Sequence, residues 1–179
     1  MTGSVPVELG NKLSQLEWLV LDSCALTGSL PTSFGQLSRI EWLDLDYNSL
    51  SGPLPSELGT WTDLKYVELE FNQFNGMLPT ELGLLPLNVL RLDSNRFSGA
   101  IPTEFGNLSS LEALTLGENL LSGTIPTELG NLSQMVAMTL HLNELTGRIP
   151  TELAQLSNSL LAFRRSLARC PCCNSCLCI

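Results

Sequence analysis

The sequence predicts an α/β solenoid, a stack of short coils that share one continuous core. One segment of about 24 residues recurs along most of the 179-residue chain, a period typical of repeat architectures. Within it, polar and apolar residues alternate before an asparagine, which indicates a strand, and a glycine and a proline follow. Because a coil of this length cannot bury its apolar face alone, neighbouring coils must stack.

The asparagine sets the register of the repeat. It recurs at spacings of 24, 23, 24 and 24 residues, as Asn48, Asn72, Asn95, Asn119 and Asn143. Six full units follow, over 13–36, 37–60, 61–83, 84–107, 108–131 and 132–155. Residues 2–11 match the second half of another unit, and Met1 stands where the repeat has leucine, so we expect a fragment of a longer protein. The predicted domains are a solenoid over 1–155 and a tail over 156–179.

The residues before each asparagine predict one strand per coil. In 42–46, Leu43 and Leu45 alternate with Trp42, Asp44 and Asp46, which is the period of a half-buried strand. Strands of neighbouring coils, stacked at about 4.8 Å, would form a parallel sheet. The leucines would face the core, and the alternate residues would face outward.

The other repeated positions predict turns. A buried asparagine must be hydrogen-bonded, and the backbone of the turn after the strand offers partners, so the five asparagines would form a structural ladder. Cys24 takes this position in the first coil. The glycine that follows suits a turn with positive φ, and the proline stops any long helix. The Thr-Glu pair after most prolines predicts a short helical turn capped by the threonine.

The half-repeat Leu/Phe-x-Gly-x-Ile/Leu-Pro resembles that of the plant-type leucine-rich repeat family, and the motifs cover residues 2–155. The resemblance implies a right-handed, horseshoe-like arc with a concave parallel sheet and short 3₁₀ or helical turns on the convex side. It also implies a short second strand near each Gly-x-Ile-Pro. Members include receptor-kinase ectodomains, polygalacturonase-inhibiting proteins and some ice-binding proteins. The resemblance favours the extracellular or secretory side, although no signal peptide is visible.

Charge narrows the class of partner. Residues 1–155 contain all 18 acidic residues and six of the nine basic ones, whereas the tail contains three arginines and no acid. An acidic solenoid argues against nucleic acid and favours partners with basic groups. No uninterrupted apolar run approaches 20 residues, so we expect no transmembrane segment in this chain.

The outward strand positions are the candidate site, because the core does not dictate them. Those of the first four coils are aromatic and acidic, and those of the last two are small and nearly neutral. The predicted partner-binding residues are Trp18, Trp42, Tyr66, Asp22, Asp44, Asp46, Glu68, Glu70, Arg91 and Asp93. Tyr47 and Phe71 flank the same end, and Arg91 is expected to pair with Glu68 or Asp93. Exposed Trp and Tyr commonly anchor interfaces, although stacked aromatics could simply cover the sheet.

These residues predict a non-enzymatic recognition module that binds a protein, peptide or glycan partner on the concave face, like a receptor ectodomain or an inhibitor. No motif brings a nucleophile and a base together, and the only histidine, His141, is placed far from Asp22, Asp46 and Glu70. We therefore expect no enzyme and no cofactor. The carboxylate column could share a cation such as Ca²⁺, but no motif predicts a metal site.

The alternative is a structural or surface-acting solenoid without a discrete ligand, either ice-binding or membrane-tethered. A column of hydroxyls after the prolines is the regular surface that ice binding would need. Its members are Thr32, Ser56, Thr80, Thr103, Thr127 and Thr151. The neighbouring glutamates would disturb a flat face of this kind.

Three positions invite covalent modification. Asn107 and Asn131 begin Asn-Leu-Ser sequons for N-glycosylation, which arise directly from the repeat. Five of the six cysteines lie within 170–178, too crowded for a disulfide-bonded cap. Cys176 begins a C-terminal Cys-a-a-X sequence, the pattern of a lipid anchor. Metal binding by the clustered cysteines, or an unusual end of the chain, are the alternatives.

Overall fold

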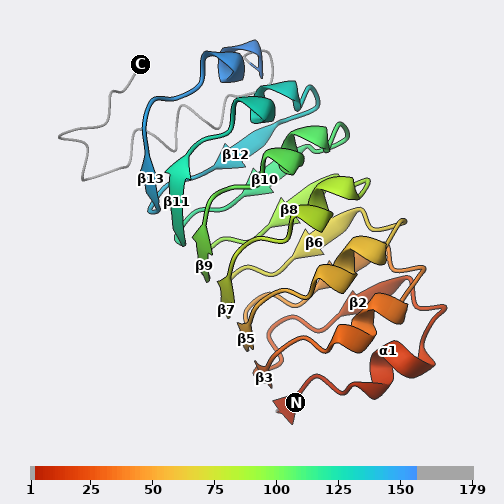
Figure 1. Cartoon of the computed structure of the whole chain (residues 1–179). Helices are drawn as coiled ribbons and strands as arrows, with labels where there is room; N and C mark the ends of the chain where they lie inside the picture. Colours follow the sequence, from red (N-terminus) through yellow and green to blue (C-terminus); the bar gives the residue numbers. More distant parts are fainter. Residues whose placement is uncertain (1–2, 157–179) are drawn as a thin grey trace.

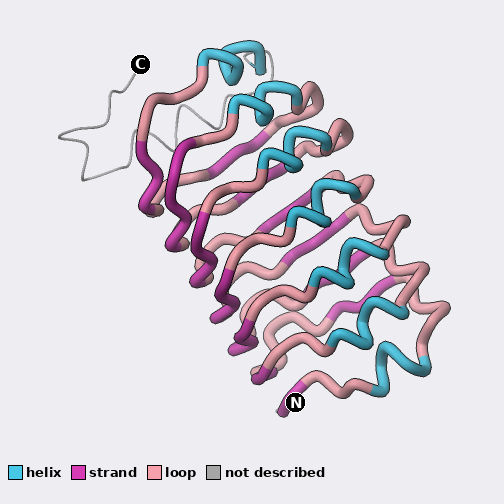
Figure 2. Tube along the Cα trace, in the orientation of Figure 1, coloured by secondary structure: helices cyan, strands magenta, loops and turns pink. Residues whose placement is uncertain are grey.

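The computed structural model describes residues 3–156 and shows the predicted solenoid. We number its coils 1 to 6 after the six full repeat units. Within the described residues, strands from successive coils pair in parallel and form two sheets. Figure 2 shows the result as three columns, two of strands and one of helical turns. The leucine-rich solenoid expected from the repeat is confirmed.

The first sheet is six-stranded within the described residues and contains the strands before the asparagines. It consists of β2 (Trp18–Val20), β4 (Trp42–Asp44), β6 (Tyr66–Glu68), β8 (Val89–Arg91), β10 (Ala113–Thr115) and β12 (Ala137–Thr139), paired in chain order (Figure 1). The central residue of each strand is buried and its two neighbours are partly or fully exposed. One face of this sheet therefore covers the core, and the other is the concave face.

The strands of the second sheet follow the turn that contains the asparagine, and the repeated glycine lies at or near their ends. The strands of this sheet are β1 (Gly3–Ser4), β3 (Leu26–Gly28), β5 (Ser49–Gly52), β7 (Gln73–Gly76), β9 (Arg96–Gly99), β11 (Leu120–Thr124) and β13 (Glu144–Thr146). The repeated glycine has φ between 78 and 84 in all six coils, a backbone region that side chains disfavour. This explains why the repeat keeps glycine there.

The helical column completes each coil. It contains α1 (Glu8–Lys12), followed by the 3₁₀ turns η1 (Thr32–Gln36), η2 (Ser56–Thr60), η3 (Thr80–Leu84), η4 (Thr103–Asn107), η5 (Thr127–Asn131) and η6 (Thr151–Leu156). The expectation that the threonine caps each turn is wrong. Proline precedes η1 to η5 as the capping residue without a side-chain bond, and the hydroxyls of Thr80 and Thr103 instead donate to the next glutamate. All hydroxyls of the convex column except that of Thr32 therefore donate to the carboxylate of the next residue.

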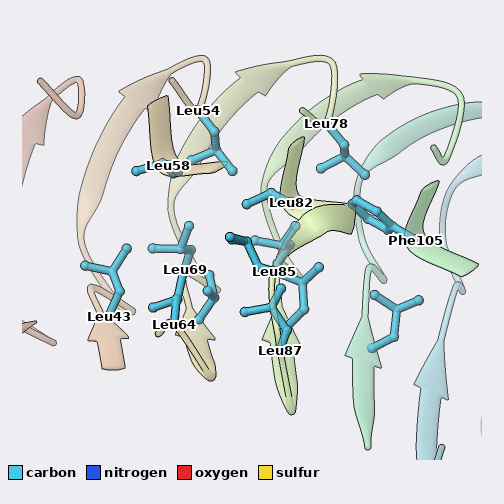
Figure 3. Close-up of a cluster of buried hydrophobic side chains, with 14 of the residues drawn as sticks. Leu43, Leu54, Leu58, Leu64, Leu69, Leu78, Leu82, Leu85, Leu87 and Phe105 are labelled. Carbon is cyan, nitrogen blue, oxygen red and sulfur yellow. The ribbon is translucent and has the colours of Figure 1, made fainter. Parts of the chain in front are cut away.

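The core fills the space between the sheets and the turns. Leucines from each element point inward and meet those of the next coil, as Figure 3 shows for Leu43, Leu58 and Leu82. Trp61, the first residue of coil 3, is completely buried, and its Nε1 donates to Phe34 O of coil 1 at 2.8 Å. The core is thus continuous along the stack, which gives the concave sheet a rigid support.

The asparagine column links neighbouring coils through the backbone. In each case the side-chain amide donates to carbonyls of its own turn and of the preceding coil, and its oxygen accepts an N–H from the preceding coil. The members are Asn48, Asn72, Asn95, Asn119 and Asn143. The residue just before each asparagine has φ between 47 and 55, although none is glycine. The asparagine bonds hold this turn closed.

Candidate ligand-binding face

The concave residues of coils 1 to 3 lie in register on neighbouring strands. Trp18 is paired with Trp42, and Trp42 with Tyr66, along the first outward column. The second column runs parallel to it and aligns Asp44 with Glu68. The predicted site residues of these coils therefore share one surface. The near-constant repeat length places these side chains in register on neighbouring strands.

Three aromatic side chains lie at the start of the strands. Trp18 is 65% exposed and Tyr66 is 38% exposed, whereas Trp42 between them is half-buried. The Trp42 and Tyr66 rings are in contact, with centroids 5.8 Å apart and planes tilted by 50°. The indole Nε1 of Trp42 is buried without a hydrogen-bond partner in the described part of the chain. The hydrogen-bonding capacity of this donor is therefore unmet within the described residues.

A second aromatic pair lies just beyond the other end of the strands. Tyr47 and Phe71 stack with ring centroids 4.4 Å apart and planes 15° from parallel. They are 55% and 44% exposed, and both have positive φ, which is rare for bulky residues. The turn geometry projects both rings outward at the edge of the face. Aromatic surface thus borders the acidic strip at both ends of β4 and β6.

The carboxylate strip lies between the Trp42–Tyr66 pair and the Tyr47–Phe71 pair. It consists of Asp44, Asp46, Glu68 and Glu70. Burial raises the pKa of Asp46 to about 6, with further contributions from the charges of Asp44 and Asp22. Burial also raises the pKa of Glu70 to about 7, partly opposed by hydrogen bonding and by the charge of Arg91. The pKa of Asp44 is likewise raised by burial. Asp46 and Glu70 are therefore poorly solvated, and their pKa values lie nearer to neutral pH than those of free carboxyl groups.

Arg91 on β8 is the cation of this strip. Its Nη1 lies 2.9 Å from Glu68 Oε2 and 4.0 Å from Glu70 Oε1. Glu70 Oε2 is buried without a partner among the described residues. Of the two partners predicted for Arg91, the guanidinium contacts Glu68. Asp93 is instead engaged with residues of coils 5 and 6.

The concave face of coils 4 to 6 contains a polar cluster that sequence reasoning missed. Asp93 Oδ1 accepts hydrogen bonds from Gly117 N and Thr139 Oγ1, each at 2.9 Å. The His141 ring covers Gly117, where an added Cβ would lie 2.5 Å from the imidazole Cε1. Its Nε2 is 3.9 Å from a Glu118 oxygen. His141 is three coils from Glu70 but has acidic neighbours of its own. The signal in the sequence was Gly117, a glycine in an otherwise polar column.

Asp22 is exposed in coil 1, and its charge acts on the carboxylates of Asp44 and Asp46 in the next coil. The other predicted positions lie away from both groups. Asn107 and Asn131 are exposed at the ends of η4 and η5, in the helical column. Cys176 and the cysteine-rich tail lie outside the described residues. Within 3–156, no group of three or more His, Cys, Asp or Glu side chains is arranged to hold a metal ion. None of the described helices is long and apolar enough to span a membrane.

Comparison with known proteins identifies the repeat. The leucine rich repeat models match residues 15–37, 39–61 and 85–145. The chain is similar to the Arabidopsis thaliana GASSHO1/SCHENGEN3 ectodomain, with 37% identity and a TM-score of 0.83 over 87% of this chain and 18% of that one. It is also similar to the Arabidopsis receptor kinase HAESA, with 33% identity and a TM-score of 0.84 over 87% of this chain and 26% of that one.

A third solved structure is closer in size. The Arabidopsis thaliana BIR2 ectodomain is 34% identical to the chain, with a TM-score of 0.65 over 79% of this chain and 72% of that one. The comparison with curated proteins found no match. The chain spans about a quarter or less of the GASSHO1 and HAESA ectodomains. It belongs to the leucine-rich repeat family, in the plant type that these receptor ectodomains represent.

Proposed function

We propose that this chain is a non-enzymatic recognition module whose concave face binds a protein, peptide or glycan at coils 1 to 3. The observation that carries the proposal is the row of outward aromatics Trp18, Trp42 and Tyr66 beside a carboxylate strip on a rigid sheet. Aromatic side chains give large contact area at low cost in conformational entropy, and they are enriched at the centres of interfaces.

The relatives support a binding role of this kind. The GASSHO1 structure is a complex with CASPARIAN STRIP INTEGRITY FACTOR 2, and the HAESA structure is a complex with the peptide hormone IDA and the co-receptor SERK1. Because this chain covers only a part of those ectodomains, the analogy extends to the type of surface and not to their ligands. A peptide or a partner protein is the occupant that the analogy favours.

The polar cluster of coils 4 to 6 does not support catalysis. The Thr139 hydroxyl donates to Asp93, while His141 Nδ1 is buried without a partner among the described residues. Asp93 Oδ1 also accepts from Gly117 N, so it acts here as a structural acceptor between coils, and the Thr139 hydroxyl donates to it rather than to the imidazole of His141. The cluster is consistent with a rigid second half of the binding surface.

The proposal is tested with ligands selected without bias. A random 12-residue peptide library displayed on phage and an oligosaccharide array are both screened against the full chain. We expect most selected ligands to bind the variant W18A/W42A/Y66A at least about tenfold more weakly, since aromatic anchors dominate interface energies. The control M77A/L84A removes two apolar side chains exposed away from the concave strands and should bind like wild type. Ligands indifferent to the aromatic substitutions would disprove the proposal.

A further inference from the structure

Glu70 has an unmet hydrogen-bond acceptor on the proposed face. Its side chain is only 13% exposed, and Oε2 is buried without a partner among the described residues. A desolvated carboxylate oxygen without a donor is unfavourable, so a ligand that supplies a donor gains more here than at a solvated acid. The nearest cation, Arg91, is 4.0 Å from the other oxygen, Oε1, and is 2.9 Å from Glu68. The negative charge of Glu70 is therefore only weakly compensated by Arg91.

The surroundings select the kind of donor. Asp46 on the adjacent coil and Glu68 on the same coil add negative charge beside Glu70, and Arg91 is the cation whose charge acts on this strip. The stacked rings of Tyr47 and Phe71 follow directly after Asp46 and Glu70 in their coils. A planar cation that donates hydrogen bonds to carboxylate oxygens from its edge and stacks its face on an aromatic ring matches this environment. That group is a guanidinium.

The aromatic row lies elsewhere on the same face. Trp42, whose indole N–H is buried without a partner among the described residues, begins the strand that leads to Asp46. Asp46 follows Trp42 by four positions, about 13 Å in extended chain. An extended peptide covers this distance with about four residues. One short segment can therefore cover the Trp42 ring while a side chain reaches the carboxylates.

We infer that the ligand is a peptide segment with an arginine whose guanidinium binds Glu70 and Asp46, beside Arg91 and at the Tyr47–Phe71 edge. This deepens the proposed function and depends on it. A lysine has the charge but lacks the planar fork, and a neutral glycan has neither. The internal contact of Arg91 with Glu68 shows that this strip already holds one guanidinium beside a carboxylate.

The test is a double-mutant cycle on the selected phage peptides. Each arginine in the tightest concave-face peptide is replaced by citrulline, its neutral isostere, and by lysine. Binding of both forms is measured to wild type and to Glu70→Gln. We expect citrulline to weaken binding to wild type by about tenfold or more, and lysine by less, while the loss caused by citrulline is several-fold smaller in Glu70→Gln, where Asp46 alone remains to bind the guanidinium.

A matched control removes the same charge elsewhere. Glu57→Gln changes an exposed acid on η2, so the loss caused by citrulline should persist as in wild type. The variant Arg91→Gln should bind the arginine peptide more tightly than wild type, because it frees the carboxylates that Arg91 contacts. These two results would separate a local contact from a general effect of net charge.

The outcomes distinguish this inference from the proposed function. Concave-face peptides without arginine, or a citrulline effect unchanged by Glu70→Gln, would overturn the arginine contact and leave the recognition role standing. If no peptides are selected and oligosaccharides lose binding in W18A/W42A/Y66A, the arginine contact is likewise overturned and the recognition role stands. Ligands insensitive to the aromatic substitutions would overturn both.

Discussion

At the scale of single residues, the amide of each ladder asparagine satisfies backbone groups from two coils. Asn95 Nδ2 donates to Leu69 O at 2.9 Å, and its Oδ1 accepts from Phe74 N at 3.0 Å. It is 8% exposed, so water does not readily replace these bonds. Asn143 makes the corresponding bonds to Leu116 O and Leu121 N but is only partly buried.

Replacing a central ladder residue should therefore cost more than replacing a peripheral one. We expect Asn95→Ala to lower the free energy of unfolding by about 3 kcal/mol, because it leaves buried backbone groups without partners. Asn143→Ala should cost about half as much, since water reaches its turn. Urea unfolding followed by circular dichroism measures both. Equal losses would show that the ladder bonds act independently of burial.

A second residue-scale prediction concerns Gly117. An added Cβ would lie 2.5 Å from His141 Cε1 and 3.0 Å from Asp93 Oδ1, so Gly117→Ala must displace the imidazole or the carboxylate. The chain has one histidine, and its imidazole proton signals in NMR therefore report on this site alone. We expect these signals to shift in Gly117→Ala and to stay unchanged in Ser133→Ala, an exposed control. An unshifted signal would contradict the packing of His141 on Gly117.

The sequence could predict the asparagine ladder but not the cluster around His141. A polar residue repeated among leucines must be buried and hydrogen-bonded, which is a local rule. The contact of Asp93 with Thr139 joins residues 46 positions apart and exists because Gly117 leaves space between them. Side-chain reach across an intervening coil is not encoded in the repeat period. Likewise, burial of Glu70 depends on its neighbours and could not be read from alternation.

At the scale of elements, the helical turns stack closely because most of them contain a glycine directly after a leucine or phenylalanine, where the next turn leaves no room for a Cβ. A Cβ on Gly106 in η4 would lie 2.5 Å from the backbone oxygen of Glu128 in η5. The same close approach recurs between Gly83 and Glu104. The threonine cap was predicted wrongly because proline already provides the extended backbone that starts each turn. The strands were predicted correctly because alternation follows directly from one-sided burial.

The glycines of the turns and of the second sheet should respond differently to alanine. We expect Gly106→Ala to lower the unfolding free energy by about 3 kcal/mol, because the opposing atom is backbone and cannot move freely. Gly123→Ala should cost about 1 kcal/mol, since its φ of 78 is unfavourable for alanine but the nearest atom is 3.8 Å away. Thermal and urea unfolding check the order, and a larger loss at Gly123 would reverse this interpretation.

At the scale of the whole molecule, the solenoid leaves one face of its first sheet uncovered while fixing the side chains on it. Each coil supplies two or three outward positions, and the core beneath them is continuous. Acidic side chains placed in register on neighbouring coils therefore crowd together. The repeat stabilises this crowding through the core, so the face can retain desolvated carboxylates that a less rigid surface would rearrange. Stability and ligand binding should consequently both depend on pH.

The pH dependence of stability has a definite sign. Burial raises the pKa of Glu70 from 4.5 to about 7, so the folded chain holds more protons than the unfolded chain across that interval. The free energy of unfolding must then decrease as pH rises through this window. Between pH 4.5 and 8, we expect wild type to lose about 1 kcal/mol more than Glu70→Gln, after allowance for solvent access. The variant should be the more stable protein at pH 8. Glu57→Gln, on the convex side, should parallel wild type, and urea titrations at several pH values compare the three. Parallel curves for Glu70→Gln and wild type would show that this carboxyl is not desolvated.

The pH dependence of ligand binding should have the opposite sign from that of stability. A cationic peptide favours the ionised carboxylate, so its affinity should rise with pH over the same window in wild type and stay flatter in Glu70→Gln.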